Sequence, residues 1–284
     1  MTAAEAIRAA TARLSGTSDT ARLDAELLMA HALRVSRSDL LLRGLAVENW
    51  EAPDSFEALV DRRAACEPLA YIVGSAEFYG WPFRVTPDVL IPRPDSESVV
   101  DAAVEAAPGA MRVLDLGTGS GALLFILLGK LPKAAGVGID ASAAALEIAA
   151  ENAQVTRHVA DRAEFRRGDW TQAGWADDLG RFDLVICNPP YVEDDAELQR
   201  DVREYEPASA LFAGPDGLDD YRVLIPQMPA LLTGSGVAVL EIGHTQAEAV
   251  GAIAAEAGFS TMLRQDLGGR PRALILSLDR GESR

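Results

Sequence analysis

From residue 98 onward, the sequence alternates between short apolar runs and amphipathic segments, and this alternation strongly limits the fold. Apolar runs rich in β-branched residues predict strands, whereas apolar residues three and four positions apart predict helices. Strands separated by helices pair in parallel, and a parallel sheet needs helices over both of its faces. The sequence therefore predicts an α/β fold built on a doubly wound, mostly parallel sheet.

The predicted elements follow a regular order along this part of the chain. We expect helices over residues 98–106, 121–131, 142–154, 217–232 and 245–257, and strands over residues 111–116, 136–140, 163–168, 182–188, 236–242, 260–267 and 272–278. The last two strands have no helix between them. They are therefore expected to close the sheet as an antiparallel hairpin at its edge.

The part of the chain before the sheet has helical patterning throughout. Apolar residues recur at helical spacing over residues 2–14, 19–33, 36–44 and 54–67, with N-caps predicted at Asp19, Ser36 and Asp54. The aromatic and proline-rich stretch that follows predicts a hairpin and an extended link. We expect three parts, a small N-terminal helical bundle (1–72), a hairpin and linker (73–97), and the α/β domain (98–284).

Charge and composition argue against several classes of protein. The formal net charge is -17, with 43 acidic against 26 basic side chains, which disfavours a direct grip on nucleic acid phosphates. The sequence shows no apolar run typical of a membrane span or an export signal, and the three histidines lack the spacing of metal ligands. Cys66 lies in a segment with helical patterning and Cys187 in a strand predicted to be buried, so we expect both to be reduced core thiols. We expect a cytoplasmic protein that binds no membrane and no metal.

A glycine corner follows the first predicted strand of the α/β domain. In "VLDLGTGSGALL", Gly117, Gly119 and Gly121 separate an apolar strand from an apolar helix. Glycines allow a tight turn and a close approach of the backbone to a ligand. With Ala122 the spacing also fits a dinucleotide fingerprint, and Asp140 could hold a ribose hydroxyl. The glycines alone leave a nicotinamide cofactor open.

Asp115 favours a different cofactor. A carboxylate inside the turn repels a pyrophosphate, but it can attract the ammonium of a methionine group. The corner resembles the first motif of class I S-adenosylmethionine-dependent methyltransferases. That resemblance implies that the turn binds the methionine part of S-adenosylmethionine, that Asp140 binds the ribose, and that "RRGDW" lies at the adenine. The implied cofactor residues are Asp115, Gly117, Thr118, Gly119, Ser120, Gly121, Asp140, Asp169, Trp170 and Asn188.

A second motif ends the fourth predicted strand, in "VICNPPYVEDD". Pro189 and Pro190 lack a backbone N–H, so they stop the strand and stiffen the chain. The side-chain oxygen of Asn188 and the carbonyl of Pro189 can accept hydrogen bonds from a planar NH2 group, and Tyr191 can stack on it. The alternative is a plain turn that Asn188 caps.

Together with the glycine corner, Asn-Pro-Pro-Tyr is similar to the motif of enzymes that methylate an amide or exocyclic amine nitrogen. Such a nitrogen is a weak nucleophile because its lone pair is delocalised, so orientation and charge stabilisation are the help that it needs. This resemblance implies that Asn188, Pro189 and Tyr191 are catalytic. It also implies that these three residues and Pro190 bind the substrate.

Further segments extend the resemblance over nearly the whole chain. They are "RLDAELLMAHAL", "EPLAYIVGSAEFYGWPFRVTPDVLIPRPDSE", "DLGTGSG", "GDW", "CNPPYV", "EPASALFAGPDGLDDYR" and "EIGHTQ". The chain is similar to the protein-glutamine N5-methyltransferases that modify class I peptide chain release factors. The resemblance implies methylation of the glutamine in a Gly-Gly-Gln loop, with S-adenosyl-L-homocysteine as the product. It also implies that the N-terminal helices help to hold the release factor.

Three other functions remain open from the sequence. One is a related glutamine methyltransferase of a large-subunit ribosomal protein, and another is an adenine-N6 DNA methyltransferase, which shares the Asn-Pro-Pro-Tyr motif. The third is a binding protein that has kept the fold without its activity. Within the linker, Arg93, Asp95 and Glu97 either line the cofactor mouth or brace the link, and the neighbouring prolines favour bracing.

Overall fold

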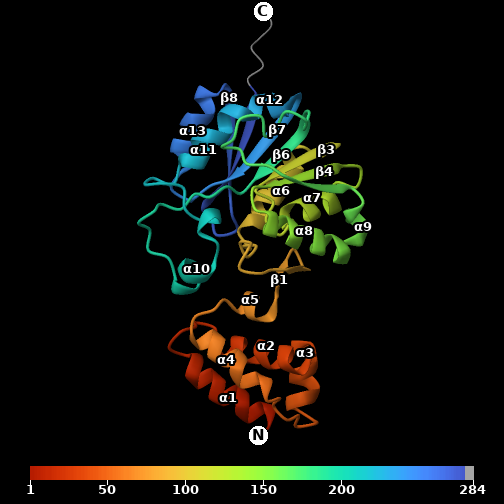
Figure 1. Cartoon of the computed structure of the whole chain (residues 1–284), viewed down its shortest axis with the longest axis vertical. Helices are drawn as coiled ribbons and strands as arrows, with labels where there is room; N and C mark the ends of the chain where they lie inside the picture. The colour runs from red at the N-terminus through yellow and green to blue at the C-terminus, as the bar shows by residue number, and fades with distance from the viewer. Residues whose placement is uncertain (279–284) are drawn as a thin grey trace, which may run out of the picture. The chain divides into compact units, whose positions relative to one another are not determined.

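The computed structural model describes residues 1–278, and its contacts divide the chain into two compact units (Figure 1). The first unit consists of Met1–Ser75 and Leu198–Tyr205, and the second of Ala76–Glu197 and Glu206–Arg284. Each unit has its own apolar core. Among the described residues, no helix combines the length and the apolar character that crossing a membrane requires.

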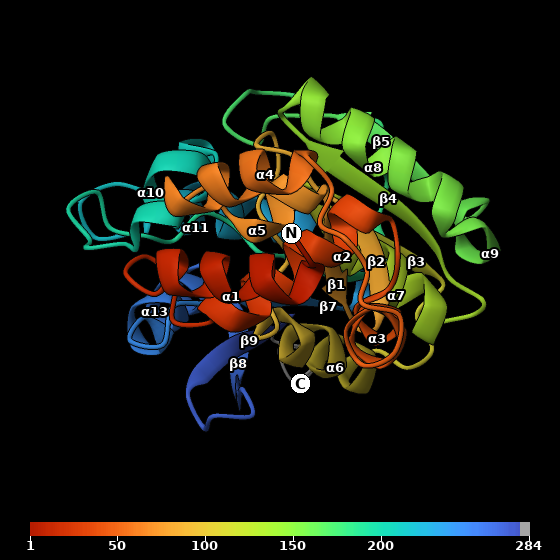
Figure 2. The same cartoon turned by 90° about the horizontal axis from the view of Figure 1, so that it is seen from below.

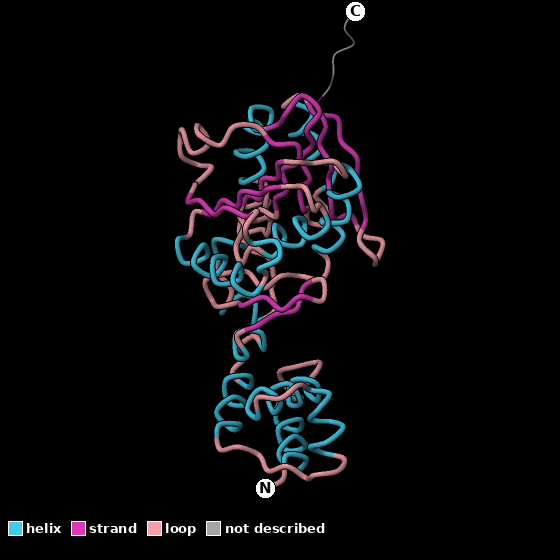
Figure 3. The backbone as a smooth tube through the Cα atoms, turned by 90° about the vertical axis from the view of Figure 1, so that its right-hand side faces the viewer, coloured by secondary structure: helices cyan, strands magenta, loops and turns pink. Residues whose placement is uncertain are grey.

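The first unit is helical (Figure 3). Its helices are α1 (Ala3–Leu14), α2 (Ala21–Leu33), α3 (Arg37–Asp39), α4 (Ser55–Ala64), α5 (Leu69–Val73) and α10 (Arg200–Tyr205). The apolar faces of α1, α2 and α4 meet in a core that contains Ile7, Leu28 and Phe56. The short helix α10 belongs to this unit although it is distant in sequence, and the Tyr205 hydroxyl donates to the carbonyl of Ala65 at 3.0 Å.

The predicted helix caps are only partly correct. Ser36 caps α3 through its hydroxyl, as predicted. The N-cap of α2 is Thr20 rather than Asp19, and the Thr20 hydroxyl donates to Asp24 at 2.8 Å instead of capping the helix. Asp54 occupies the N-cap position of α4 without a side-chain hydrogen bond to the backbone.

The predicted helix over residues 36–44 does not continue as an α-helix. After α3 the chain passes into a π-helical segment, Leu40–Leu45. The backbone at Gly44 lies against the Trp50 ring, where a Cβ atom would overlap the indole. The amide of Trp50 also donates to the carbonyl of Gly44 at 2.9 Å. Packing against this ring accompanies the departure from α-helical geometry.

A buried ion pair links two helices of the first unit. The Nε of Arg63 in α4 donates to Oδ2 of Asp24 in α2 at 2.7 Å, and both side chains are almost fully buried. Asp24 also accepts hydrogen bonds from the hydroxyls of Ser18 and Thr20. A buried charge of this kind is tolerated only while its partner is present.

The second unit contains a two-stranded sheet and a seven-stranded sheet. The hairpin consists of β1 (Ser75–Phe78) and β2 (Trp81–Arg84), and the first residue of β1, Ser75, is still counted in the N-terminal segment of the first unit. The strands of the large sheet are β3 (Arg112–Leu116), β4 (Ala135–Asp140), β5 (Ala163–Arg167), β6 (Phe182–Cys187), β7 (Leu232–Glu241), β8 (Phe259–Gln265) and β9 (Pro271–Leu278). Its helices are α6 (Ser96–Ala106), α7 (Ala122–Lys130), α8 (Ala143–Val155), α9 (Arg157–Ala160), α11 (Asp219–Leu224), α12 (Met228–Leu231) and α13 (Ala247–Glu256).

The strand order of the large sheet is β5-β4-β3-β6-β7-β9-β8. The first five strands in this order are parallel, and β9 is antiparallel to both β7 and β8. The predicted antiparallel hairpin at the edge of the sheet is confirmed. The second strand of this hairpin, β9, pairs with β7 and is the inner of the two, and the first strand, β8, is the edge strand of the sheet.

Successive residues of the central strands face opposite sides of the sheet. Val113 and Leu184 belong to a core that includes α6 and α7, whereas Leu114 and Val185 belong to a core that includes α11, α12 and α13. Helices therefore cover both faces, as the alternating sequence predicts (Figure 1). On the first face, α8 runs beside β4 and β5 (Figure 2).

The predicted helix over residues 217–232 is wrong in its continuity. The chain forms α11, a 3-10 turn at Ile225–Gln227 and then α12. Pro226 and Pro229 lack the N–H that a continuous α-helix would use. The strand β7 consequently begins at Leu232, four residues earlier than predicted. The short helices α5, α9 and α10 are absent from the sequence prediction.

We expect Asp24→Leu to destabilise the first unit by about 3 kcal/mol, because it leaves the buried guanidinium of Arg63 without its carboxylate. The double variant Asp24→Leu/Arg63→Met should regain most of that loss, since no unpaired charge remains. Urea unfolding of the full-length chain, followed by circular dichroism, measures both variants. Equal stability of the single variant and the wild type would contradict a structural role for the pair.

Candidate functional site

Four neighbouring parallel strands end at the same edge of the large sheet. The carboxyl ends of β5, β4, β3 and β6 lead into the four segments that the sequence selected as sites. A cavity of about 500 Å³ lies among these segments. The predicted site residues in its lining are Gly117, Thr118, Gly119, Ser120, Asp140, Asp169, Trp170, Asn188 and Pro190.

The glycine corner after β3 has a backbone that requires glycine. Gly117, Gly119 and Gly121 have φ angles of 72°, 54° and 80°, in the left-handed region that other residues rarely adopt. The amides of Gly117 and Thr118 donate to the carbonyl of Ile139, which ties the corner to the end of β4 at 2.9 Å. A Cβ at Gly117 would lie 3.3 Å from the Trp170 ring. The corner is therefore shaped by its backbone and by its neighbours.

Asp115 lies beneath this corner with one unused oxygen. Its side chain is buried, and Oδ2 accepts a hydrogen bond from the Thr118 hydroxyl at 2.6 Å. Among residues 1–278, Oδ1 has no hydrogen-bond partner. The pKa of Asp115 is raised to about 7, chiefly by burial and to a smaller extent by the negative charge of Asp140, while the Thr118 hydrogen bond opposes the shift. A cationic group that reached Oδ1 would favour the ionised form.

Asp140, at the end of β4, joins two turns. Its Oδ2 accepts from the amide of Gly119 and its Oδ1 from the amide of Ser142, both at 2.9 Å. Burial raises the pKa of Asp140, and these backbone hydrogen bonds oppose the shift. Each carboxylate oxygen can accept a further hydrogen bond, so the side chain can hold its loop and a hydroxylated ligand together.

Trp170 follows β5 and is held at both ends. Its indole Nε1 donates to Oδ1 of Asp220 at 2.8 Å, and its carbonyl accepts from the side chain of Gln227 at 3.1 Å. Asp169 accepts hydrogen bonds from the hydroxyl and the amide of Thr171, and these bonds lower its pKa. The indole therefore has a set orientation in the cavity lining.

The Asn-Pro-Pro-Tyr corner follows β6. Asn188 is half-buried and lines the cavity, while Pro189 is buried and does not line it. Within the described part of the chain, no hydrogen bond occupies the Asn188 side-chain amide. The backbone pairs again at Tyr191 and Val192, whose amides donate to the carbonyl of Leu211. The corner is braced after the prolines, and the Asn188 amide stays available to a ligand.

Four of the predicted residues lie outside the cavity lining. They are Asp115, Gly121, Pro189 and Tyr191. Asp115 is in hydrogen-bond contact with the lining residue Thr118, and the φ angle of Gly121 allows the turn before α7. Tyr191 is half-buried behind the corner, where its hydroxyl donates to Oε1 of Glu241 at 3.2 Å.

The linker residues brace the fold, and one of them also reaches the cavity. Arg93 lines the cavity and pairs with buried Glu206 at 2.5 Å. Asp95 accepts from Arg272 at 3.1 Å, and the Glu97 carboxylate accepts from the amide of Tyr79 at 2.9 Å. Arg93 therefore both lines the cavity and braces the linker, whereas Asp95 and Glu97 only brace the linker.

Sequence reasoning missed two residues beside the site. Asn152 in α8 is fully buried, and its amide donates to the carbonyls of Ser120 and Arg84. Asp220 lines the cavity and holds the Trp170 indole. The Asp220 position lies in "GLDDYR", inside a segment that carried the family resemblance but had no role assigned to it. Asn152 had no sequence signal, since it is one polar residue in an alanine-rich helix.

Comparisons with known proteins match both units of the chain. A model of the PrmC N-terminal domain matches residues 5–74, and a methyltransferase domain model matches residues 108–249. The release factor glutamine methyltransferase of Cereibacter sphaeroides is 44% identical over 98% of this chain and 99% of its own length. This chain belongs to the release factor glutamine methyltransferase family. The relative from Vibrio cholerae, with the same name, is 38% identical over 95% of this chain and 94% of its own.

Family membership confirms the resemblance and the methyltransferase class inferred from the motifs. A methyltransferase structure from Pyrococcus furiosus is similar in fold only. Its TM-score is 0.50, with 16% identity over 78% of this chain and 96% of that one. The predicted class I methyltransferase architecture is confirmed by the parallel sheet, its antiparallel edge and the helical N-terminal unit.

The raised pKa of Asp115 predicts a specific pH dependence of stability. The folded-state pKa of about 7 exceeds the usual 3.8, so the folded protein holds this proton more tightly. The stabilising contribution is complete below about pH 4 and is lost as the pH rises through about 7. The free energy of unfolding of the wild type should therefore fall relative to Asp115→Asn, by up to about 1.4 kcal/mol per pH unit in this interval.

Urea unfolding at pH 5, 6, 7 and 8 without added ligand measures this difference. Asp169→Asn is the matched control, because hydrogen bonds from Thr171 lower the pKa of Asp169 and its contribution does not change in this range. A stability difference between wild type and Asp115→Asn that is independent of pH would show that the fold does not raise this pKa.

Proposed function

We propose that this enzyme methylates the side-chain amide nitrogen of the glutamine in the Gly-Gly-Gln loop of class I peptide chain release factors, using S-adenosyl-L-methionine. The relatives support this substrate, because they match this chain over nearly its full length and are named release factor glutamine methyltransferases. The observation that carries the chemistry is the free amide of Asn188 in a cavity that Asp140 and Trp170 also line.

The donor set of the cavity fits the cofactor. The unused Oδ1 of buried Asp115 is complementary to an ammonium group, and Asp140 can accept from ribose hydroxyls. The fixed indole of Trp170 and the carboxylate of Asp169 would take the adenine. The glycine corner, with Thr118 and Ser120, supplies the close backbone approach. S-adenosyl-L-methionine, when bound, supplies an electrophilic methyl group.

The Asn-Pro-Pro-Tyr corner would orient the glutamine amide. Asn188 can accept one N–H of the substrate NH2 through its side-chain oxygen, and the Pro189 carbonyl can accept the other. Two acceptors fix the plane of the amide and favour positive charge that develops on its nitrogen. Pro190 limits movement of the corner, and the Tyr191 ring, which lies behind the corner and outside the cavity lining, would form the rear wall for the flat amide.

The N-terminal helices, residues 1–72 in our domain assignment, would hold the release factor. This proposal rests on the match of residues 5–74 to the PrmC N-terminal domain. The net charge of -17 gives the enzyme no general attraction for nucleic acid, so we propose a protein partner without direct nucleic acid contact.

The first test is methyl incorporation from labelled S-adenosyl-L-methionine into a purified class I release factor. A release factor with the loop glutamine replaced by alanine, a large-subunit ribosomal protein preparation and duplex DNA serve as the comparisons. Label on the loop glutamine alone, located by mass spectrometry, is the expected result. Label on ribosomal protein or DNA alone would replace the proposed substrate by one of the two alternatives.

Asn188→Ala should lower kcat/KM by about 100-fold, because it removes an acceptor for the substrate NH2. Its affinity for S-adenosyl-L-homocysteine, measured by calorimetry, should be retained, since the glycine corner and Asp140 are unchanged. Asn188→Asp keeps an acceptor oxygen and should retain more activity than Asn188→Ala. Gln265→Ala, which removes an exposed amide from β8, is the control. Wild-type turnover in Asn188→Ala would remove Asn188 from this role.

A further inference from the structure

A buried carboxylate lies behind the Asn-Pro-Pro-Tyr corner. Glu241 is the last residue of β7 and is 1% exposed. Its Oε2 accepts from the Ser96 hydroxyl at 2.5 Å, and its Oε1 accepts from the Tyr191 hydroxyl at 3.2 Å. Its backbone carbonyl accepts from the Tyr221 hydroxyl at 2.7 Å. Burying a carboxylate away from solvent costs free energy unless hydrogen bonds compensate, so the role of this buried group requires an explanation.

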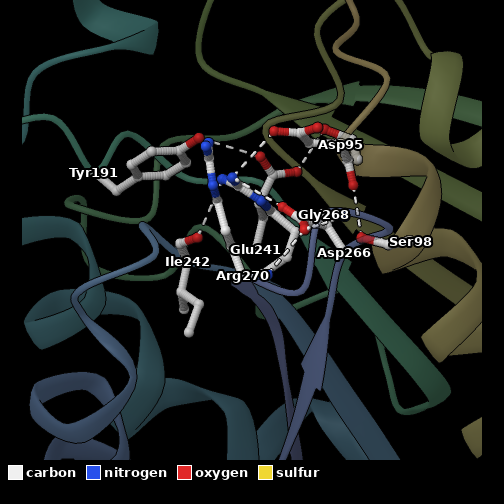
Figure 4. A network of polar contacts seen from close by, with 10 residues as sticks. Asp95, Ser98, Tyr191, Glu241, Ile242, Asp266, Gly268 and Arg270 are labelled. Carbon is white, nitrogen blue, oxygen red and sulfur yellow. Dashed lines mark hydrogen bonds and ion pairs between the residues drawn. The ribbon is translucent and has the colours of Figure 1, made fainter.

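The surroundings of Glu241 keep it in one position. Figure 4 shows Tyr191, Glu241 and Asp95 converging from three different elements of the second unit. Arg272 in β9 is nearly buried, contacts Asp95 at 3.1 Å and Asp266 at 3.5 Å, and supplies positive charge near Glu241. Burial raises the pKa of Glu241, while the Ser96 hydrogen bond and the charge of Arg272 oppose this shift. Neither oxygen of the carboxylate can leave its partner without leaving a buried polar atom unpaired.

Tyr191 is held from both of its ends by one segment of the chain. Gln246, five residues after Glu241, donates from its side-chain amide to the Tyr191 carbonyl at 3.0 Å. The same amide donates to the carbonyl of Gly217 at 3.2 Å, and a Cβ at Gly217 would overlap the Tyr191 carbonyl. The backbone of Tyr191 is thus fixed by Gln246, and its ring is fixed at the far end by Glu241.

We propose that Glu241 is a positioning residue for methyl transfer: it holds the Tyr191 ring, which lies behind the Asn-Pro-Pro-Tyr corner and outside the lining of the cavity, at the angle needed to form the rear wall of the glutamine pocket. The inference rests on the proposed function of Tyr191 as that wall. Glu241 does not itself line the cavity, and its carboxylate bonds to none of the residues proposed to bind the cofactor. Its carboxylate does bond to Ser96, which lines the cavity, and it is the second contact, with the Tyr191 hydroxyl, to which the proposal assigns the effect on catalysis.

The protonation of the Tyr191 hydroxyl is consistent with Glu241 acting as the acceptor that holds the ring. Burial raises the pKa of the Tyr191 phenol, and the negative charge of Glu241 raises it further, so the hydroxyl stays protonated and donates. A ring that pivots about its own backbone needs a second fixed point to hold its plane. Orientation matters here because a small misplacement of a group in an active site can cost a large factor in rate.

Kinetics of three variants test the proposal. Tyr191→Phe keeps the ring and removes the hydroxyl, and Glu241→Gln keeps the shape and removes the charge. Each should lower kcat by about tenfold, from the loss of one buried hydrogen bond to a charged group, with little change in the KM for S-adenosyl-L-methionine. The double variant should lose no more than the larger single loss. Multiplied losses of about 100-fold would overturn the proposal.

Tyr191→Phe tests the proposal even if Glu241→Gln fails to fold. A kcat equal to that of the wild type in Tyr191→Phe would mean that the hydroxyl does not position the ring, and the proposal would fall. Asp266→Asn is the matched control, because it removes a neighbouring carboxylate from Arg272 without touching Tyr191. It should retain the wild-type kcat.

A spectroscopic measurement separates this proposal from the proposed function. Fluorine NMR of the full chain labelled with 3-fluorotyrosine reports on five tyrosines, and loss of one signal in Tyr191→Phe assigns Tyr191. Glu241→Gln should shift and broaden that signal, whereas Asp266→Asn should leave it in place. An unchanged Tyr191 signal in Glu241→Gln, or an equal change in both variants, would overturn the positioning role even if the enzyme methylates release factors.

Discussion

The parallel pairing of β5, β4, β3 and β6 is the constraint on which the site depends. Parallel strands in register deliver their carboxyl ends to one edge of the sheet, so the segments after them meet. Asp115, Asp140, Trp170 and Asn188 are far apart in sequence, yet each lies in or directly after one of these strands. Strand pairing therefore brings the four together.

The site also holds two carboxylates away from bulk solvent, Asp115 fully and Asp140 in part. Asp140 uses both oxygens to hold the turns on either side of it, and Asp115 keeps one oxygen without a partner among the described residues. A buried carboxylate without full pairing is unfavourable in its charged form, and its pKa rises accordingly. A cationic ligand would stabilise the ionised form of such a carboxylate. The unfavourable burial of Asp115 would therefore favour the binding of a ligand with an ammonium group, as proposed for this cavity.

The parts of the molecule that the sequence predicted well are those with a local physical cause. Gly117 and Gly119 identify a turn because their positive φ angles exclude most other residues, and Pro189 and Pro190 end a strand because they lack N–H groups. The predicted helix over 217–232 failed where Pro226 and Pro229 interrupt an apolar periodicity that is otherwise continuous. The apolar periodicity favours a continuous helix there, but the prolines lack the N–H groups that such a helix needs, and the helix is interrupted.

The sequence by itself determined the alternating α/β framework, the helical first unit, and the residues at the carboxyl ends of the strands. Only the tertiary structure decided that Glu241 meets Tyr191 across 50 residues, and that Asn152 supports the glycine corner from α8. The physical reason is that periodicity and backbone preference act over a few neighbouring residues. A buried polar contact depends instead on strand order and helix packing, which appear only when the whole unit has folded.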